Sequence, residues 1–315
     1  MKVKIFTHDD IDAAGCAILG KLAFRNNVDI EYHHHESLAQ RWDSFTSVVD
    51  NKTEYDDYDM VFVVDISPTE EWSAIIDTLD LRNKIKVFDH HKTTLLLNKY
   101  DWVLVTVEHY PGRKACGTSL FYNYLMTKDL VPTMEDNFIN LIRELDTWEW
   151  EAKNNYKAME LGHLFTCLDM ERFVNKYVEH FSEIETSFIY AEGDYFNDFD
   201  RQLLDLFKYK IQKYINDKSK FIIEKVIDGY NVGVVIAESY PSELGNYIAK
   251  NNPQYDFVIV INPNTGISYR CVREDIDLSQ FAQKLGGGGH QKASGSRIPD
   301  GARDSLVNYI FSNNL

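Results

Sequence analysis

Cysteine is scarce in this sequence. The 315 residues contain four, Cys16, Cys116, Cys167 and Cys271, which are widely separated and form no Cys-x-x-Cys pair. This spacing excludes a zinc knuckle and a disulfide framework. No uninterrupted apolar run approaches the ~18 residues that a membrane span requires, and the chain opens on a strand-like segment rather than a signal peptide. We therefore expect a cytoplasmic protein without a membrane partner.

Positive charge is also in short supply. The chain has 33 lysines and arginines against 49 aspartates and glutamates, which gives a formal net charge of −16. Proteins that hold long nucleic acids neutralise many phosphates with lysine and arginine, so this composition argues against a processive nuclease on long strands. A short substrate needs only a few local cations. Most of the acid excess is best explained as a solvated surface.

The distribution of apolar segments predicts two domains, because a chain of 315 residues is too long for a single core. Strand-like runs first alternate with helix-sized stretches, which is typical of a parallel three-layer α/β domain. A long helical pattern without glycine or proline follows, and then shorter strand-like runs. We expect a parallel-sheet α/β domain over 1–190, a helical connector over 191–220 and a smaller α+β domain over 221–315.

An acid and two histidines follow one of the predicted strands. The strand-like run 85–88 leads directly into Asp89, His90 and His91. Open parallel sheets bind ligands just beyond the carboxyl ends of their strands. Carboxylate and imidazole together suit Mn²⁺, Fe²⁺ or Zn²⁺. An exposed polar loop could contain the same three residues, so this segment indicates a metal centre only if other ligands accompany it.

The first predicted strand ends in the same way. The run 3–6 leads into His8, Asp10 and Asp12. The two aspartates are two residues apart, so in an extended segment their side chains point to the same side and could hold adjacent metal ions. We therefore expect both at one metal centre.

Two more acids complete the predicted ligand set. Asp65 follows the strand-like run 60–64, and from a neighbouring strand it would bridge the two ions. Asp146 lies at the end of the amphipathic helical stretch 138–145. Alone it would be an ordinary helix-terminus acid, and in this company it is the expected last ligand.

Together with a glycine-rich segment near the end of the chain, these residues resemble the motifs of DHH/DHHA1-family phosphoesterases. The motifs occur in the family's order and extend over most of the chain. The sequence looks most similar to the small two-domain members that degrade very short oligonucleotides, the nano-RNases, whose relatives act on 3′-phosphoadenosine 5′-phosphate or linear dinucleotides. The matching residues are His8, Asp10, Asp12, Gly15, Asp65, Asp89, His90, His91, Asp146, Gly286 to His290, Ala293 and Gly295.

The resemblance implies two-metal hydrolysis of a phosphoester in short RNA or DNA oligonucleotides or a small nucleotide. Mn²⁺ is the expected ion, with Mg²⁺ as an alternative, and a homodimer is a possible assembly. The spacing of His8 departs from the family pattern. Many relatives have three residues between the leading histidine and the first aspartate, whereas only Asp9 separates His8 from Asp10 here. The implied ligands are His8, Asp10 and Asp65 for one ion, and Asp12, Asp65, His90 and Asp146 for the other.

The resemblance also implies catalytic roles for Asp89 and His91. A ligating imidazole needs its second nitrogen fixed, so Asp89 would orient His90 through a hydrogen bond. His91 would point the other way and contact the phosphate.

The predicted second domain supplies candidate substrate contacts. Four consecutive glycines lack Cβ atoms, so their N–H groups can approach a phosphate or a base. They are Gly286, Gly287, Gly288 and Gly289. His290 follows and could bond a phosphate oxygen. Arg270, on a predicted strand, would offer a planar fork to a phosphate, with Arg273 as the second choice.

Some features of the first domain allow two interpretations. Arg113 precedes a predicted helix start, where cations and free N–H groups can hold an anion. The histidines 33–35 follow the second strand and are better explained as a polar strand end. Trp148 and Trp150 could stack on a base, although core packing is an equal alternative.

Three other functions stay open at this point. A non-catalytic nucleotide-binding protein would be expected to lack at least one of the metal ligands, and all are present. A soluble pyrophosphatase would share the chemistry of the first domain but not the glycine-rich motif. A processive single-strand-specific exonuclease is the main alternative, and the acidic charge weighs against it.

Overall fold

The computed structural model describes residues 1–47, 53–78, 81–131, 136–184 and 195–312. The chain divides into two compact units, Met1–Leu204 and Asp205–Leu315, and each is described by itself. The boundary falls within α8 (Asp198–Lys218), inside the segment 191–220 expected as a connector, of which residues 191–194 lie outside the described ones.

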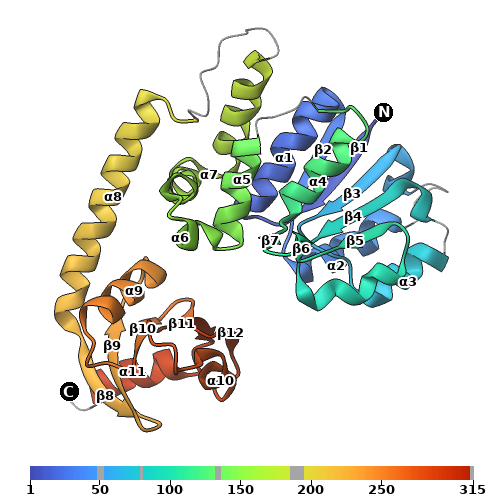
Figure 1. The fold of residues 1–315 in the computed structure, drawn as a ribbon. Helices are drawn as coiled ribbons and strands as arrows, with labels where there is room; N and C mark the ends of the chain where they lie inside the picture. Colours follow the sequence, from blue (N-terminus) through green and yellow to red (C-terminus); the bar gives the residue numbers. More distant parts are fainter. Residues whose placement is uncertain (48–52, 79–80, 132–135, 185–194, 313–315) are drawn as a thin grey trace. The chain divides into compact units, whose positions relative to one another are not determined.

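The sheet of unit 1 is parallel and five-stranded, in the order β2-β1-β3-β4-β5 (Figure 1). Strands β1 and β3 pair in register from Val3 with Met60 to Thr7 with Val64. The strands are β1 (Val3–Thr7), β2 (Val28–Tyr32), β3 (Met60–Val64), β4 (Ile85–Asp89) and β5 (Val103–Val105).

Alternating residues of β3 build the cores on the two faces of this sheet. Phe62 and Val64 belong to one core, and Val61 and Val63 belong to the other, as a period of two requires. Buried side chains of α1 (Ile11–Phe24), α4 (Gly117–Met126), α5 (Asp136–Asp146) and α7 (Tyr156–Ile184) fill the first core. Those of α2 (His35–Thr46) and α3 (Glu70–Thr78) fill the second.

Shorter elements connect these layers. A hairpin of β6 (Glu108–Tyr110) and β7 (Arg113–Lys114) precedes α4, and α6 (Glu149–Lys153) follows α5. The 3-10 turns are η1 (Arg25–Asn27), η2 (Glu54–Asp57), η3 (Leu81–Lys84) and η4 (Lys92–Lys99).

Unit 2 is an α+β domain with a mixed six-stranded sheet in the order β12-β13-β11-β10-β9-β8. Strands β9 and β10 are parallel, and the other pairs are antiparallel. Its elements are η5 (Ser219–Phe221), β8 (Ile223–Ile227), β9 (Tyr230–Ile236), α9 (Pro241–Asn251), β10 (Phe257–Asn262), β11 (Gly266–Arg270), α10 (Leu278–Gln283), β12 (Gly288–His290), β13 (Ala293–Ser296) and α11 (Ala302–Ser312).

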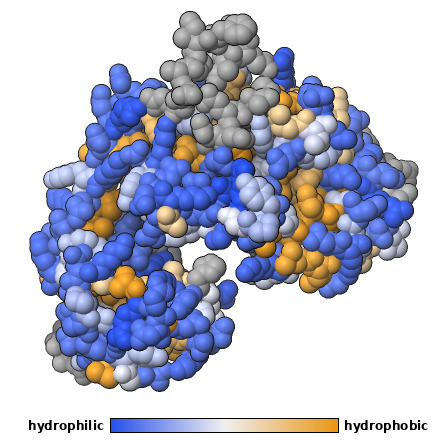
Figure 2. Space-filling model, viewed as in Figure 1, coloured by the Kyte–Doolittle hydropathy of each residue, from blue (hydrophilic) through white to orange (hydrophobic). Residues whose placement is uncertain are grey.

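The sheet of unit 2 also separates two cores. Val258 and Val260 of β10 pack with α8 and α9, whereas Phe257 and Ile259 pack with α10. The structure thus confirms the expected fold class, a three-layer parallel α/β domain and a smaller α+β domain. In the described part of the chain no helix has the length and apolar character needed to cross a membrane. Hydrophilic residues cover most of the surface visible in Figure 2.

Candidate metal centre

The predicted ligands lie at the carboxyl ends of three neighbouring strands. His8 follows β1, Asp65 follows β3, and His90 follows β4. In the strand order β2-β1-β3-β4-β5 the chain reverses its direction of winding between β1 and β3. Open parallel sheets form ligand sites at this switch point, because the connections there diverge to opposite faces.

Asp10 caps the first helix of the sheet. One of its carboxylate oxygens accepts hydrogen bonds from the N–H groups of Asp12 at 3.0 Å and Ala13 at 3.1 Å, and the other lies 2.9 Å from His8 Nδ1. The hydrogen bond with Asp10 raises the pKa of His8. Burial acts to raise the pKa of Asp10, but the His8 and Ala13 hydrogen bonds outweigh it and lower that pKa.

The expectation that Asp10 and Asp12 extend from one side of an extended segment is wrong. Helix α1 begins at Ile11, so Asp10 is its cap and Asp12 lies in the first helical turn. The capping hydrogen bonds of Asp10 favour this early helix start. Both aspartates still reach the centre, because the N-terminus of α1 points at it.

The N-terminus of a second helix holds Asp12 in place. Gly117 N–H donates to one Asp12 carboxylate oxygen at 2.6 Å, and Thr118 N–H donates to the other at 2.8 Å. The Thr118 hydroxyl donates to the Asp12 carbonyl at 2.6 Å. Helix N-termini favour anions because their first N–H groups lack partners within the helix. Asp12 is completely buried, and α4 supplies the polar contacts that this burial requires.

Two glycines allow these helices to approach so closely. A Cβ on Gly117 would lie 2.5 Å from Asp65 Cβ and 2.8 Å from Asp65 Cα. A Cβ on Gly15 would lie 2.2 Å from Thr118 Oγ1. The contribution of Gly117 and Thr118 is not among the predictions from the sequence. The small residues at positions 116–119, at the start of an apolar helix, were the available signal.

Asp65 occupies the middle of the centre with a left-handed backbone, φ 61°, which is uncommon for a residue with a side chain. Its carboxylate oxygen lies 3.2 Å from His90 Nε2. The same nitrogen lies 3.5 Å from a carboxylate oxygen of Asp146 and 3.8 Å from one of Asp12. The structure therefore brings together residues that are up to 134 positions apart in the chain, from Asp12 to Asp146.

Three atoms of this cluster are buried and have no hydrogen-bond partner in the described part of the protein: Asp65 Oδ2, His90 Nε2 and Asp146 Oδ2. Buried polar atoms are seldom left without a partner, and a shared cation would satisfy all three. Potential ligand atoms of His8, Asp10 and Asp65 lie within 4.8 Å of one another, as do those of Asp12, His90 and Asp146. Carboxylate and imidazole donors in such sets fit a divalent ion.

Asp89 pairs with the second histidine rather than the first. One of its oxygens contacts His91 Nδ1 at 2.7 Å and accepts the His90 N–H at 2.7 Å, and the other accepts the Ser67 hydroxyl at 2.5 Å. The expected hydrogen bond to the His90 ring is wrong, because the backbone after β4 directs that ring toward Asp65. The rings of His90 and His91 lie 4.5 Å apart, so His91 does not point away.

This pairing sets the charges of both groups. The Asp89 hydrogen bond raises the pKa of His91 against the effect of burial. Burial alone would raise the pKa of Asp89, but the His91 and Ser67 hydrogen bonds hold it below its usual range. The pair therefore favours a charged imidazolium next to a charged carboxylate.

The acid and the histidines that follow β1 and β2 make local contacts. One carboxylate oxygen of Asp9 lies 3.4 Å from His34 Nε2, and the other lies 3.7 Å from His8 Nε2. His33 packs on Phe6 and contacts Glu31 at 3.0 Å, as expected for a polar strand end. The side chain of His35 lies outside the described residues.

The candidate substrate-binding residues of unit 2 differ in their contacts. Arg270 donates to Ser242 Oγ at 2.7 Å and to the Tyr269 carbonyl at 2.8 Å, and burial lowers its pKa. Arg273 pairs with Asp275 and Asp256, so its charge is already compensated. The side chain of His290 lies outside the described part of the structure, although its backbone belongs to β12.

The glycine run packs against its neighbouring strand. A Cβ on Gly287 would lie 2.0 Å from the Gly295 carbonyl, and one on Gly289 would lie 2.7 Å from the Ala293 carbonyl. Gly288, between them, has open space. Two of the predicted contacts thus have a structural reason to be glycine. Gly286 and Gly287 line an open pocket of about 410 Å³ together with Arg297.

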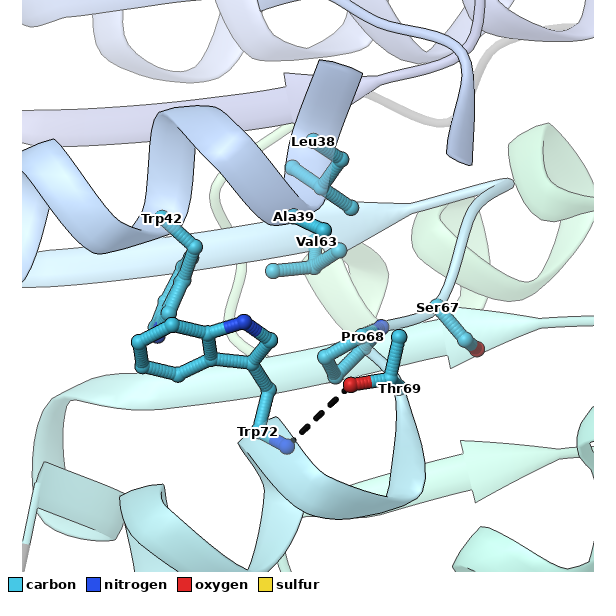
Figure 3. A pocket seen from close by; sticks show the side chains of 8 residues that line it. All are labelled: Leu38, Ala39, Trp42, Val63, Ser67, Pro68, Thr69 and Trp72. Atoms are coloured by element: carbon cyan, nitrogen blue, oxygen red, sulfur yellow. Dashed lines mark hydrogen bonds between the residues drawn. The ribbon is translucent and has the colours of Figure 1, made fainter. Parts of the chain in front are cut away.

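A second, much smaller cavity lies beside α2 and α3 (Figure 3). Trp42 and Trp72 line it with Val63, and the Trp72 N–H donates to Thr69 Oγ1 at 3.2 Å. Its volume of about 10 Å³ is at the lower limit for one water molecule. We interpret it as a packing defect between aromatic rings, because no nucleotide could enter it.

Mn²⁺ should raise the melting temperature, because the centre gathers carboxylates that repel one another. The pKa values of Asp65 and Asp146 are both raised. Burial is the main cause, and the negative charges of Asp12 and Asp10 add to it. Such groups destabilise the metal-free fold progressively as the pH rises from about 4 through their raised pKa values. Mn²⁺ at 100 times its Kd should restore about 2.7 kcal/mol. Melting curves between about pH 5 and 8 test this, and an equal Mn²⁺ shift in Asp65→Asn would contradict it.

Comparison with known proteins gives this geometry a context. Residues 2–146 match the family described as "DHH family, N-terminal domain". The chain is 35% identical to oligoribonuclease NrnB of Bacillus subtilis (strain 168) over 311 residues, which cover 98% of this chain and 75% of that protein. It is 21% identical to a 3′,5′-cyclic-nucleotide phosphodiesterase of Helicobacter pylori, over 97% of this chain and 95% of the relative.

Solved structures share the fold at lower identity. A pGpG-specific phosphodiesterase, PggH, from Vibrio cholerae aligns with a TM-score of 0.54 at 13% identity, over 99% of this chain and 98% of that one. The DHH domain of a member of the s1p family of ribosomal proteins aligns with a TM-score of 0.55 at 15% identity, over 99% and 86%. The match over most of both chains to a relative that is 35% identical shows that this chain belongs to the DHH family.

Proposed function

We propose that the protein is a two-metal-dependent phosphoesterase that hydrolyses short oligonucleotides to mononucleotides. One observation carries the proposal: three buried atoms without partners, on Asp65, His90 and Asp146, face one another among further carboxylates. The similarity to a protein named oligoribonuclease supports the class of substrate. Activity on 3′-phosphoadenosine 5′-phosphate belongs to the same proposal.

Two Mn²⁺ ions fit the donors best, with Mg²⁺ as the alternative, since imidazole is a better ligand for Mn²⁺ than for Mg²⁺. Bound ions would lower the pKa of a coordinated water and stabilise negative charge on the phosphoryl group. Asp65 would bridge the two sets, because its carboxylate also lies 3.2 Å from His90 Nε2. His8 and Asp10 complete one set, and Asp12, His90 and Asp146 complete the other.

Asp89 and His91 would act as a pair on the substrate. His91 Nδ1 donates to the Asp89 carboxylate at 2.7 Å, and this hydrogen bond favours a charged imidazolium, whose positive charge would strengthen a hydrogen bond to a phosphate oxygen. A charge-assisted hydrogen bond of this kind is roughly twice as strong as a neutral one. His91 is therefore proposed as a catalytic residue, and Asp89 acts through it.

Unit 2 would hold the rest of the nucleotide. Arg270 is partly buried and makes no ion pair within the described residues, so it keeps a charge available for a phosphate. Gly287, Gly288, Gly289 and His290 are the other proposed contacts. We accordingly propose catalysis for 1–190, a connector for 191–220 and substrate binding for 221–315.

The length of the substrate tests the proposal. The value of kcat/KM should fall as oligonucleotides grow from about 2 to 24 residues, because extra phosphates meet an acidic surface. Salt should have little effect on the shortest substrates, since few counterions are released. Steady-state kinetics with Mn²⁺ at two salt concentrations measure both quantities.

The alternatives predict different outcomes in the same assay. A flat or rising length profile with a steep salt dependence would indicate a processive exonuclease. Binding without turnover would indicate a nucleotide-binding protein, and turnover of pyrophosphate alone would indicate a pyrophosphatase. A cytoplasmic location and a homodimer stay predictions.

A further inference from the structure

Two cations of the β6-β7 hairpin have no acidic partner. Arg113 and Lys114 form no ion pair with any carboxylate in the described ranges, although the chain carries 49 acids against 33 basic residues. Arg41, by contrast, is paired with Glu31 and Glu54. The hairpin therefore keeps two positive charges that the fold itself does not neutralise.

The Arg113 side chain is fixed in position but incompletely hydrogen-bonded. Its Nη2 donates to Asn140 Oδ1 at 2.8 Å and its Nη1 to the Tyr110 hydroxyl at 3.3 Å. Its Nε is buried and has no partner in the described part of the protein. Two of the five N–H donors of the guanidinium are thus used, and a held fork of this type matches a phosphate.

Lys114 joins the hairpin to the metal centre. Its Nζ donates to the Thr147 carbonyl at 2.9 Å, and Thr147 directly follows Asp146. The Lys114 charge acts to lower the pKa of Asp146, so the two groups lie within electrostatic range. One N–H of the ammonium is used here, and two are left for an anion.

Residues close in sequence to Arg113 and Lys114 connect the hairpin to the metal centre and add exposed aromatic rings. Three residues after Lys114, the N–H of Gly117 contacts Asp12 at 2.6 Å. Trp148, next to Thr147, has a left-handed backbone with φ 61° and is 52% exposed. Tyr110 on the hairpin is 57% exposed. Exposed aromatic rings beside unpaired cations are typical of sites for nucleotides.

We propose that Arg113 and Lys114 bind a second phosphate of the substrate, a terminal one that is not cleaved. This inference rests on the proposed function and adds a preference for short oligonucleotides with a phosphorylated end. The cleaved phosphate has the metal ions and His91 as its partners. A terminal phosphate carries a charge of about −1.5 to −2, and it needs cations of its own.

The test compares pApA, ApAp and ApA as substrates with Mn²⁺. Wild-type kcat/KM should be at least about tenfold higher for one phosphorylated dinucleotide than for ApA, because a hydrogen bond to a charged group contributes about 1.5–3 kcal/mol. Arg113→Gln should reduce this preference to about twofold or less and leave ApA turnover within about twofold. Arg113→Lys, which keeps the charge, should retain part of the preference.

The matched control is Arg82→Gln, which removes an exposed arginine that pairs with Asp77 elsewhere in unit 1 and should leave the preference unchanged. If wild type hydrolyses all three substrates equally, or if Arg113→Gln lowers all three alike, the terminal-phosphate site is overturned and the proposed function stands. If wild type hydrolyses none of them, both proposals are overturned.

Discussion

Asp65→Asn should lower kcat by about 10³-fold or more at saturating Mn²⁺, which corresponds to about 4 kcal/mol of barrier. Asp65 is 2% exposed, lies 3.2 Å from His90, lies within 4.8 Å of ligand atoms of His8 and Asp10, and is the proposed bridge between the two ions. An amide offers one neutral oxygen in place of two that share a negative charge, so neither ion would be held as before. Asparagine also tolerates the left-handed backbone at position 65, and the fold should persist.

Asp129→Asn is the matched control for this experiment. Asp129 also has a left-handed backbone, φ 52°. It is exposed and follows the C-terminal end of α4, which is the end opposite to Gly117. Its substitution should leave kcat and Mn²⁺ content unchanged. More than about a tenth of wild-type turnover in folded Asp65→Asn would remove the bridging role.

Gly117→Ala should cost both stability and activity through one added methyl group. Its Cβ would lie 2.5 Å from Asp65 Cβ and 2.9 Å from the Asp65 backbone nitrogen, and neither atom can move without moving the strand end. Forced overpacking costs about 1–3 kcal/mol. The displaced helix would also loosen the hydrogen bonds to Asp12, and an error of about 1 Å can cost 10²-fold in rate.

Gly20→Ala is the matched control for this substitution. Its Cβ would lie 2.4 Å from the Cδ1 methyl of Ile5, which is the end of a flexible side chain on β1, and Gly20 lies in the half of α1 that is far from Asp12. The Ile5 methyl can move, and alanine is favoured over glycine inside a helix, so this variant should keep its Mn²⁺ affinity and most of its stability, whereas Gly117→Ala should lose both. Calorimetric titration with Mn²⁺ measures the difference, and unchanged affinity in Gly117→Ala would refute the positioning role.

The sequence was sufficient to predict where the candidate ligands lie in the fold. Strands rich in valine, isoleucine and phenylalanine end at Thr7, Val64 and Asp89, and polar residues follow each of them. Because all parallel strands point the same way, their ends must share one edge of the sheet. That geometry holds whatever the details of packing.

The contacts around each ligand could not be predicted in this way. Whether Asp12 is extended or helical depends on one capping interaction of Asp10, and pattern alone does not fix helix boundaries to a residue. His90 and His91 are adjacent, so only the backbone after β4 decides which ring meets Asp89. Gly117 matters because of its distance to Asp65, which is a tertiary property.

The two peptide hydrogen bonds to Asp12 also bear on the discrimination between ions. Each carboxylate oxygen already accepts an N–H, from Gly117 and Thr118, which holds the group rigidly and leaves it fewer lone pairs. Ca²⁺ takes six to eight oxygen ligands and often binds a carboxylate through both oxygens. A carboxylate clamped in this way suits a smaller ion that needs one oxygen from it, so we expect the helix start at Gly117 to disfavour Ca²⁺ relative to Mn²⁺.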